Sequence, residues 1–268
     1  MATKFDNVLT SPPSGRSVPL ILDHASYGSA RILRGAPVPW SEPIECQSYF
    51  GQAQGLLRPD TTLVDIGAAY HQQLSAQPGL LDAMGARGRT GYALKTLLAD
   101  DELAASAARL VEVLSKTSHQ PVVLQVPAPL RWLALAQTRC GNDNLADIEP
   151  DHGESASMYL AAWLRRFEAL PITLLLLDGR RNDDPALTGL VQENLAAYTP
   201  LSNAVEHYRW GLALRTDAEL LFHGGEPGAV VPQSFWTDGI APHGRALFAE
   251  VPADAEPELV LTQLALLV

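Results

Sequence analysis

Hydrophobic residues in this chain form short continuous runs that alternate with segments of helical periodicity. The best-defined runs cover residues 18–23, 61–66, 122–126 and 172–177, and they predict strands. Because each run is apolar at successive positions, it indicates a strand that is buried on both faces. We therefore expect these four strands to be neighbours in a parallel sheet covered by helices.

Weaker strand signals follow at residues 211–215, 219–223 and 230–235. Helical patterns are predicted over residues 42–55, 100–116, 154–170, 185–198 and 257–267. This alternation predicts an α/β fold, a single (β/α)8-like (TIM-type) barrel over residues 18–268, irregular or with one strand missing. An open doubly wound sheet is the structural alternative, but the turn after the first strand, HASYGSAR, lacks the GxGxxG pattern.

The first 17 residues contain Ser-Pro-Pro-Ser-Gly and are predicted to form a flexible arm. They lack the apolar core of a signal peptide, and the apolar runs further along are too short to cross a membrane. We expect a cytoplasmic protein. Cys46 and Cys140 lie far apart, so neither a disulfide framework nor a cysteine-rich zinc site is expected.

The formal net charge of −11 opposes binding to nucleic acid. We expect a small-molecule substrate as partner, with neither nucleic acid nor a membrane, and a homodimer is left open.

Polar side chains at the carboxyl ends of parallel strands converge on one face of a barrel. Candidates for proton transfer are the acids and imidazoles that follow the apolar runs: Asp65, Asp178, His223 and His24. Candidates for substrate binding are the cations, amide, imidazole and indole near the same ends: Arg180, Arg215, Gln125, His207 and Trp236. We expect Asp65, Asp178, Arg180 and His223 to share one pocket with His24 at its edge.

Each acid candidate has a structural alternative. Asp65 can instead cap a helix, and Asp178 can form a turn ion pair with the arginine of DGRRNDD. A lone histidine such as His24 is often a satisfied core residue. His223 precedes two glycines whose backbone can hold an anion, or which simply form a tight loop.

Several other features of the sequence give weaker evidence for a functional site. His207 lies in NAVEHYRW, which can border a pocket or be a packed connection. The stretch DIEPDHGES has a metal-like composition but follows a turn and leads into a helix, which favours a solvated loop with capping groups. GxSxG, P-loop and HExxH motifs are absent from the sequence. The scattered tryptophans are typical of core, although they can also line an apolar pocket.

Four segments, in order, resemble the superfamily that joins uroporphyrinogen decarboxylase and cobalamin-independent methionine synthase. They are LVDIG at 63–67, VPAPLRWLALA at 126–136, YLAAWLRRFEALPITLLLLDG at 159–179 and LSNAVEHYRWGLAL at 201–214. The resemblance implies a barrel with a site at its mouth, and either decarboxylase or methyltransferase chemistry.

The departures from these families bear on the chemistry. The synthase branch holds zinc through His-x-Cys and a distant Cys, but here LLFHGGEPG has Gly225 two residues after His223. We therefore expect no zinc and no cofactor. The decarboxylase branch binds carboxylates through an arginine-rich first loop. In this sequence, Arg31 and Arg34 are the nearest equivalents of those arginines.

Two functional hypotheses follow. The first is a metal-independent enzyme that carries out decarboxylation, elimination or isomerisation by acid/base chemistry on a small, partly apolar substrate. The second is a methyltransferase-derived barrel without the zinc site, which binds a ligand or a protein.

Overall fold

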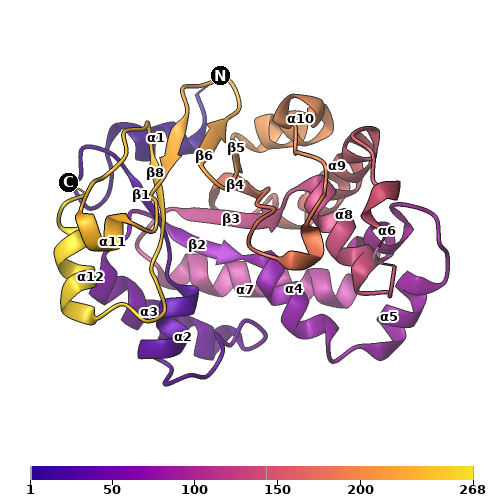
Figure 1. The fold of residues 1–268 in the computed structure, drawn as a ribbon, viewed down its shortest axis with the longest axis horizontal. Coiled ribbons are helices and arrows are strands. Elements are labelled where there is room, and N and C mark those ends of the chain that lie inside the picture. The colour runs from indigo at the N-terminus through magenta and orange to yellow at the C-terminus, as the bar shows by residue number, and fades with distance from the viewer. Residues whose placement is uncertain (1, 143, 268) are drawn as a thin grey trace.

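A barrel-like sheet forms the centre of the molecule (Figure 1). The structure is a computed structural model that describes residues 2–142 and 144–267. Among these residues, eight strands form one sheet in the order β1-β8-β7-β6-β5-β4-β3-β2, and β1 also lies beside β2, so the sheet is nearly closed. The strands are β1 (Leu20–Asp23), β2 (Thr62–Asp65), β3 (Val122–Pro127), β4 (Ile172–Asp178), β5 (Gly211–Arg215), β6 (Glu219–Phe222), β7 (Gly228–Val230) and β8 (Leu247–Glu250).

The predicted parallel core is confirmed. Strands β2, β3, β4 and β5 pair in parallel with one another, and β1 pairs in parallel with β8. At the seam between β1 and β2, the buried Asp60 carboxylate accepts the backbone N–H of Leu20, and the Asp60 N–H donates to the Leu20 carbonyl. A TIM-like α/β barrel with an unsealed seam is therefore the fold of the described chain.

Strand β6 runs against its two neighbours, which sequence analysis did not anticipate. Only residues 216–218 separate β5 from β6. A connection this short can make a hairpin but not the crossover that a parallel pair requires. The chain then enters β7, which pairs in parallel with β8 and returns the sheet to the barrel direction.

Helices pack around the sheet, most of them in the segments that connect successive strands (Figure 1). They are α1 (Lys4–Thr10), α2 (Ala25–Arg31), α3 (Pro43–Leu57), α4 (Ile66–Leu74), α5 (Pro78–Gly85), α6 (Tyr92–Ala99), α7 (Asp101–Thr117), α8 (Pro129–Thr138), α9 (Asp151–Leu164), α10 (Thr199–Tyr208), α11 (Phe235–Asp238) and α12 (Pro257–Leu264). Among the described residues, none of these helices is both long enough and apolar enough to cross a membrane.

Three predicted segments differ in the structure. The strand expected over residues 230–235 is replaced by β7 at Gly228–Val230, and the chain then turns into α11, which begins at Phe235. Residues 185–198, expected as a helix, contain 3-10 turns at Pro185–Leu187 and Leu195–Ala197 with a turn and irregular backbone between them. Gly189 has a left-handed φ of +89°, which interrupts any continuous helix there. The helix predicted over residues 154–170 begins earlier, at Asp151, and ends at Leu164 before a 3-10 turn.

The segment expected as a flexible arm contains helix α1. Thr3 and Asp6 form a capping box, in which each side chain accepts the other residue's backbone N–H. Phe5 and Val8 are buried and belong to the apolar cluster inside the barrel. The helix therefore packs against the barrel interior at its amino-terminal end, where Phe5 contacts Gly211 at the start of β5.

Candidate active site

The carboxyl end of the barrel carries a ring of inward-facing polar residues. Inside the barrel, apolar side chains from six strands form one cluster: Ile21, Leu63, Val123, Leu176, Ala213 and Phe248. Side chains alternate along a strand, so the residue two positions further on also faces inward. These next residues are Asp23, Asp65, Gln125, Asp178, Arg215 and Glu250. The apolar interior thus ends in a polar layer of four acids, an amide and a guanidinium.

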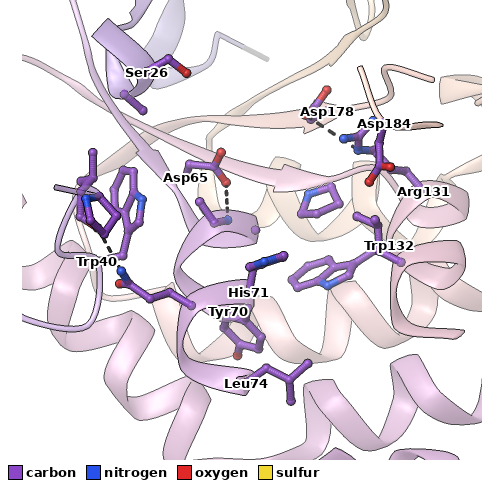
Figure 2. Close-up of a pocket in the computed structure, with 18 of the residues that line it drawn as sticks. Ser26, Trp40, Asp65, Tyr70, His71, Leu74, Arg131, Trp132, Asp178 and Asp184 are labelled. Atoms are coloured by element: carbon purple, nitrogen blue, oxygen red, sulfur yellow. Dashed lines mark hydrogen bonds and ion pairs between the residues drawn. The ribbon is translucent and has the colours of Figure 1, made fainter. Parts of the chain in front are cut away.

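A cavity of about 910 Å³ opens beside this layer. It is lined by residues of the segments that follow β1, β2, β3 and β4, and Asp65, Asp178 and Arg180 are among them. In Figure 2, Trp40 lies on one side of the cavity and Trp132 on the other, with His71 projecting from α4 between them. Three of the residues predicted from the sequence to share a pocket therefore do line one cavity.

Asp65 ends β2 and caps the following helix α4. Its Oδ1 accepts the backbone N–H of Ala68 at 2.9 Å, and its Oδ2 accepts Nε2–H of Gln125 at 2.9 Å. Burial raises the pKa of Asp65 to about 6; the Ala68 N–H and the Arg180 charge act against the rise, whereas Asp23 and Asp178 add to it. The helix-cap interpretation is confirmed, and the same carboxyl group also faces the cavity.

The pKa of Asp178, at the end of β4, is shifted in the opposite direction. Arg180 donates Nε–H to Oδ1 at 2.8 Å and Nη2–H to Oδ2 at 2.7 Å. Burial alone would raise the pKa of Asp178, but the hydrogen bonds and charge of Arg180, with the charges of Arg131 and Arg215, lower it to about 2. The turn ion pair suggested by DGRRNDD is present, and it lies at the cavity surface.

Acidic partners neutralise the other arginines at this end. Arg131 forms a two-pronged ion pair with Asp183, with N···O distances of 2.7 and 2.8 Å. Arg180 also donates Nη1–H to Glu250 at 2.8 Å. Arg215 pairs with the same Glu250 at 2.9 Å. The inner end of the cavity is consequently a network of paired charges in which Asp65 has no arginine partner.

Arg215 and Gln125 lie in the polar layer but do not line the cavity. The Arg215 guanidinium is 2% exposed and stacks 4.0 Å above the Phe248 ring. Its Nε and Nη1, and Oε1 of Gln125, are buried and have no hydrogen-bond partner among the residues that the structure describes. Both residues act one layer behind the cavity: Gln125 binds Asp65, which lines it, and Arg215 binds Glu250, which in turn accepts a hydrogen bond from Arg180.

The cavity also has a rigid aromatic wall. Trp132 of α8 meets Tyr70 of α4 edge-on, with ring centroids 5.7 Å apart. Behind them, Trp163 donates its indole N–H to the Tyr70 hydroxyl at 2.8 Å and packs edge-on against Trp132. The wall fits an apolar substrate portion, and the interlocked rings hold its shape.

Glu193 is a buried acid that sequence analysis missed. It lies in the segment after β4, where its side chain accepts the backbone N–H of Arg131 at 2.7 Å and the hydroxyl of Tyr198. Burial raises the pKa of Glu193 to about 7 in spite of these hydrogen bonds. By binding the first turn of α8, Glu193 fixes the helix that presents Arg131 and Trp132 to the cavity.

His24 is a buried histidine in an aromatic setting. Its Nδ1 lies 2.7 Å from the Tyr49 hydroxyl, which itself donates to the His24 carbonyl at 2.9 Å. The hydroxyl proton is thereby used, which assigns a proton to Nδ1. Burial lowers the pKa of His24 to about 4, so the ring is neutral at neutral pH. His24 and Asp65 border a second, much smaller cavity.

The expectation that His223 shares the pocket is wrong. Because β6 is antiparallel, its last residues pair with the beginning of β5, and the His223 N–H donates to the Leu212 carbonyl at 2.9 Å. Leu212 lies three residues before Arg215, about 10 Å back along the strand. His223 is exposed there, away from the carboxyl-end cavity.

Two further candidates also lie elsewhere. His207 is exposed near the end of α10, just before β5 begins, and does not line the cavity. Trp236 is buried in a separate apolar cluster formed largely with β1, β8 and α12. Arg31 binds Glu256 and the Asp254 carbonyl on the outside of the barrel.

The donors of the zinc site in the resembled families do not come together. His223 lies at the far end of the barrel, Cys46 is buried in α3, and Cys140 follows α8. In the part of the chain that the structure describes, no group of three or more His, Cys, Asp or Glu side chains is arranged to hold a metal. In the stretch DIEPDHGES, His152 accepts the Glu149 N–H at 3.0 Å, as a local turn contact does.

Comparisons of the chain with protein-family models, with curated proteins and with solved structures found no match. The site is therefore interpreted from its own geometry.

Proposed function

We propose that this protein is an enzyme of the lyase type that moves protons on a small, partly apolar substrate, in a decarboxylation, elimination or isomerisation. The observation that carries the proposal is the pair of aspartates at the cavity, with the pKa of Asp65 raised to about 6 and that of Asp178 lowered to about 2. Acid/base catalysis needs one group that titrates near the working pH, and divergent carboxyl groups are typical of such sites.

In this proposal Asp65 exchanges a proton with the substrate. Its two oxygens are fixed by the Ala68 N–H and the Gln125 amide, which holds the carboxyl plane toward the cavity. Arg180 lies close enough for its charge to act on Asp65, and it would stabilise negative charge that develops on the substrate. Asp178 stays ionised and keeps Arg180 in place.

The remaining parts of the proposal rest on the sequence. The resemblance to the decarboxylase and methionine synthase superfamily agrees with a site at the barrel mouth and favours a decarboxylase-like reaction. We propose a cytoplasmic enzyme with a small-molecule substrate and no nucleic-acid or membrane partner, and leave a homodimer open. No metal or cofactor is assigned, and elemental analysis of metal-replete protein is expected to find well under one equivalent of zinc.

A ligand- or protein-binding module is the second candidate. The observation that favours it is that Arg131, Arg180 and Arg215 are each already paired with a carboxylate. An arginine that stabilises a substrate anion must first weaken its ion pair with the protein carboxylate. A barrel that only binds a ligand or a protein does not require an arginine to do so.

Proton exchange in D2O distinguishes the two candidates. A panel of aryl-substituted oxo acids and unsaturated acids is incubated with the protein, and loss of C–H signals and release of CO2 are followed by NMR. We expect exchange or turnover that falls by about two to four powers of ten in Asp65→Asn, with an apparent pKa near 6 in the wild-type rate profile. Binding of panel members without exchange would favour the binding module, whereas exchange at equal rates in the wild type and Asp65→Asn would reject Asp65 as the group that transfers the proton.

A further inference from the structure

The cavity has an outer end whose charge differs from that of its inner end. Arg139 follows the last turn of α8 and lines the cavity. Among the described residues it makes no ion pair with a carboxylate, whereas Arg131 at the start of the same helix is bound to Asp183. The cavity thus offers a guanidinium whose charge is not already neutralised.

The guanidinium of Arg139 lies against the imidazole ring of His71. Its Nη2 lies 2.6 Å from Nε2 of His71 and also contacts Nδ1 of that ring. Burial and the charge of Arg139 lower the pKa of His71, while Asp184 acts in the opposite direction. A guanidinium carries five N–H donors, so this contact leaves most of them for a ligand.

Helix α8 sets the distance between the two ends. Trp132, Leu135 and Ala136 line the cavity between Arg131 and Arg139, at spacings that place them on one helix face. At 1.5 Å per residue, the eight steps from Arg131 to Arg139 span about 12 Å. From Asp65 to His71, the six steps along α4 span about 9 Å. Counted along either helix axis, roughly 9 to 12 Å of mostly apolar wall lies between the two ends of the cavity.

We propose that this cavity takes an elongated carboxylate with an apolar body, its carboxylate bound by Arg139 beside His71 and its other end reaching Asp65. A monoanion fits better than a phosphate dianion, because one guanidinium faces it and Asp184 and Asp65 line the same cavity. The assignment of the reacting end rests on the proposed function, but the anion subsite at Arg139 does not.

Calorimetric titration with matched probes tests the subsite. The probes are 6-phenylhexanoate, its uncharged amide and the shorter phenylacetate, with 6-phenylhexyl phosphate as the dianion. We expect 6-phenylhexanoate to bind at least about tenfold more tightly than the amide, and more tightly than phenylacetate or the phosphate. Arg139→Gln should abolish the preference for acid over amide, while Arg109→Gln, an exposed arginine on α7 outside the cavity, should preserve it.

Several results of the same titrations would contradict the proposal. Equal affinity for acid and amide in the wild type, a preference that survives Arg139→Gln, or no saturable binding of 6-phenylhexanoate would overturn the subsite. Tighter binding of the phosphate would overturn its assignment to carboxylates. Asp65→Asn should keep the preference for acid over amide. If exchange activity is unchanged in Asp65→Asn while Arg139→Gln loses the preference, the proposed function is rejected and the subsite stands.

Discussion

Replacing Asp65 by asparagine should stabilise the folded protein at neutral pH, although it removes a proposed catalytic group. Burial is the largest cause of the raised pKa, which stands near 6 in the fold against an ordinary 3.8. Because the folded pKa is the higher one, the folded state binds the proton more tightly than the unfolded state. Stability of the wild type therefore falls as the pH rises from about 4 to about 6, and the loss is complete above that range.

The size of the effect follows from the shift. One pKa unit corresponds to about 1.4 kcal/mol, so ionised Asp65 costs about 3 kcal/mol at pH 7.5 as an upper figure. The carboxyl group is partly open to the cavity, and water reduces this cost. Asparagine keeps the cap on the Ala68 N–H. A half-turn of the Gln125 amide, whose Nε2 now donates to Asp65, lets Oε1 accept the asparagine NH2. We expect a gain of about 1–3 kcal/mol at pH 7.5.

Asp178→Asn provides the matched control with the opposite sign. The folded pKa of Asp178 is lowered to about 2, so its stabilisation is present above about pH 4 and is lost as the pH falls through 2. This variant should lose about 2 kcal/mol or more at pH 7.5, since Arg180 then lacks its bidentate partner. The free energy of unfolding in urea is measured for both variants and the wild type at pH 4.0, 5.5 and 7.5.

The outcome that refutes this reasoning is a stability difference between Asp65→Asn and the wild type that is the same at pH 4.0 and 7.5. A net destabilisation at pH 7.5 would also contradict it, because the cap and the amide contact would then outweigh the cost of the buried charge.

Three further predictions concern the core and the polar layer. Phe5→Ala should cost about 3–4 kcal/mol in urea unfolding, because Phe5 is buried against the barrel interior; a loss below 1 kcal/mol would mean that α1 does not pack there. Arg215→Met should change the free energy of unfolding by no more than about 1 kcal/mol. Among the described residues, Nε and Nη1 of Arg215 have no hydrogen-bond partner, and Glu250 still pairs with Arg180 in the variant. A loss above about 3 kcal/mol would contradict this. The imidazole NMR signals of His24 should not shift between pH 8 and pH 5.5, and a midpoint near 6.5 would show that the ring is not buried as described.

The main part of the fold was predictable because parallel strands leave a strong local signal. Continuous apolar runs located β1 to β4, and the helical segments between them implied parallel crossovers. Strand β8 was missed because ALFAEVP is short and lies between irregular segments, so nothing separated it from a loop. The antiparallel direction of β6 was missed, although the three residues between β5 and β6 are too few for the crossover that a parallel pair requires.

Site residues were predictable where the strand itself presents them. Asp65 and Asp178 were found because each follows an apolar run. Residues presented by helices, such as His71 and Arg139, become neighbours only because side chains of α4 and of the end of α8 meet across the cavity, which sequence spacing does not encode. Glu193 gave no signal, because it lies in an irregular segment and its burial depends on the position of α8.

The two aspartates end neighbouring parts of the same parallel sheet, and the main cause that lowers the pKa of Asp178 is an arginine two residues away. Arg180 follows Asp178 by two positions and folds back onto its carboxylate. The equivalent position after Asp65 is Gly67, where an added Cβ would lie 2.9 Å from the ring of Pro127. No side chain fits there, so a cation cannot be supplied to Asp65 in the same way. The Pro127 turn that ends β3 thereby helps to keep Asp65 unpaired, and its carboxyl group remains free to exchange a proton near neutral pH.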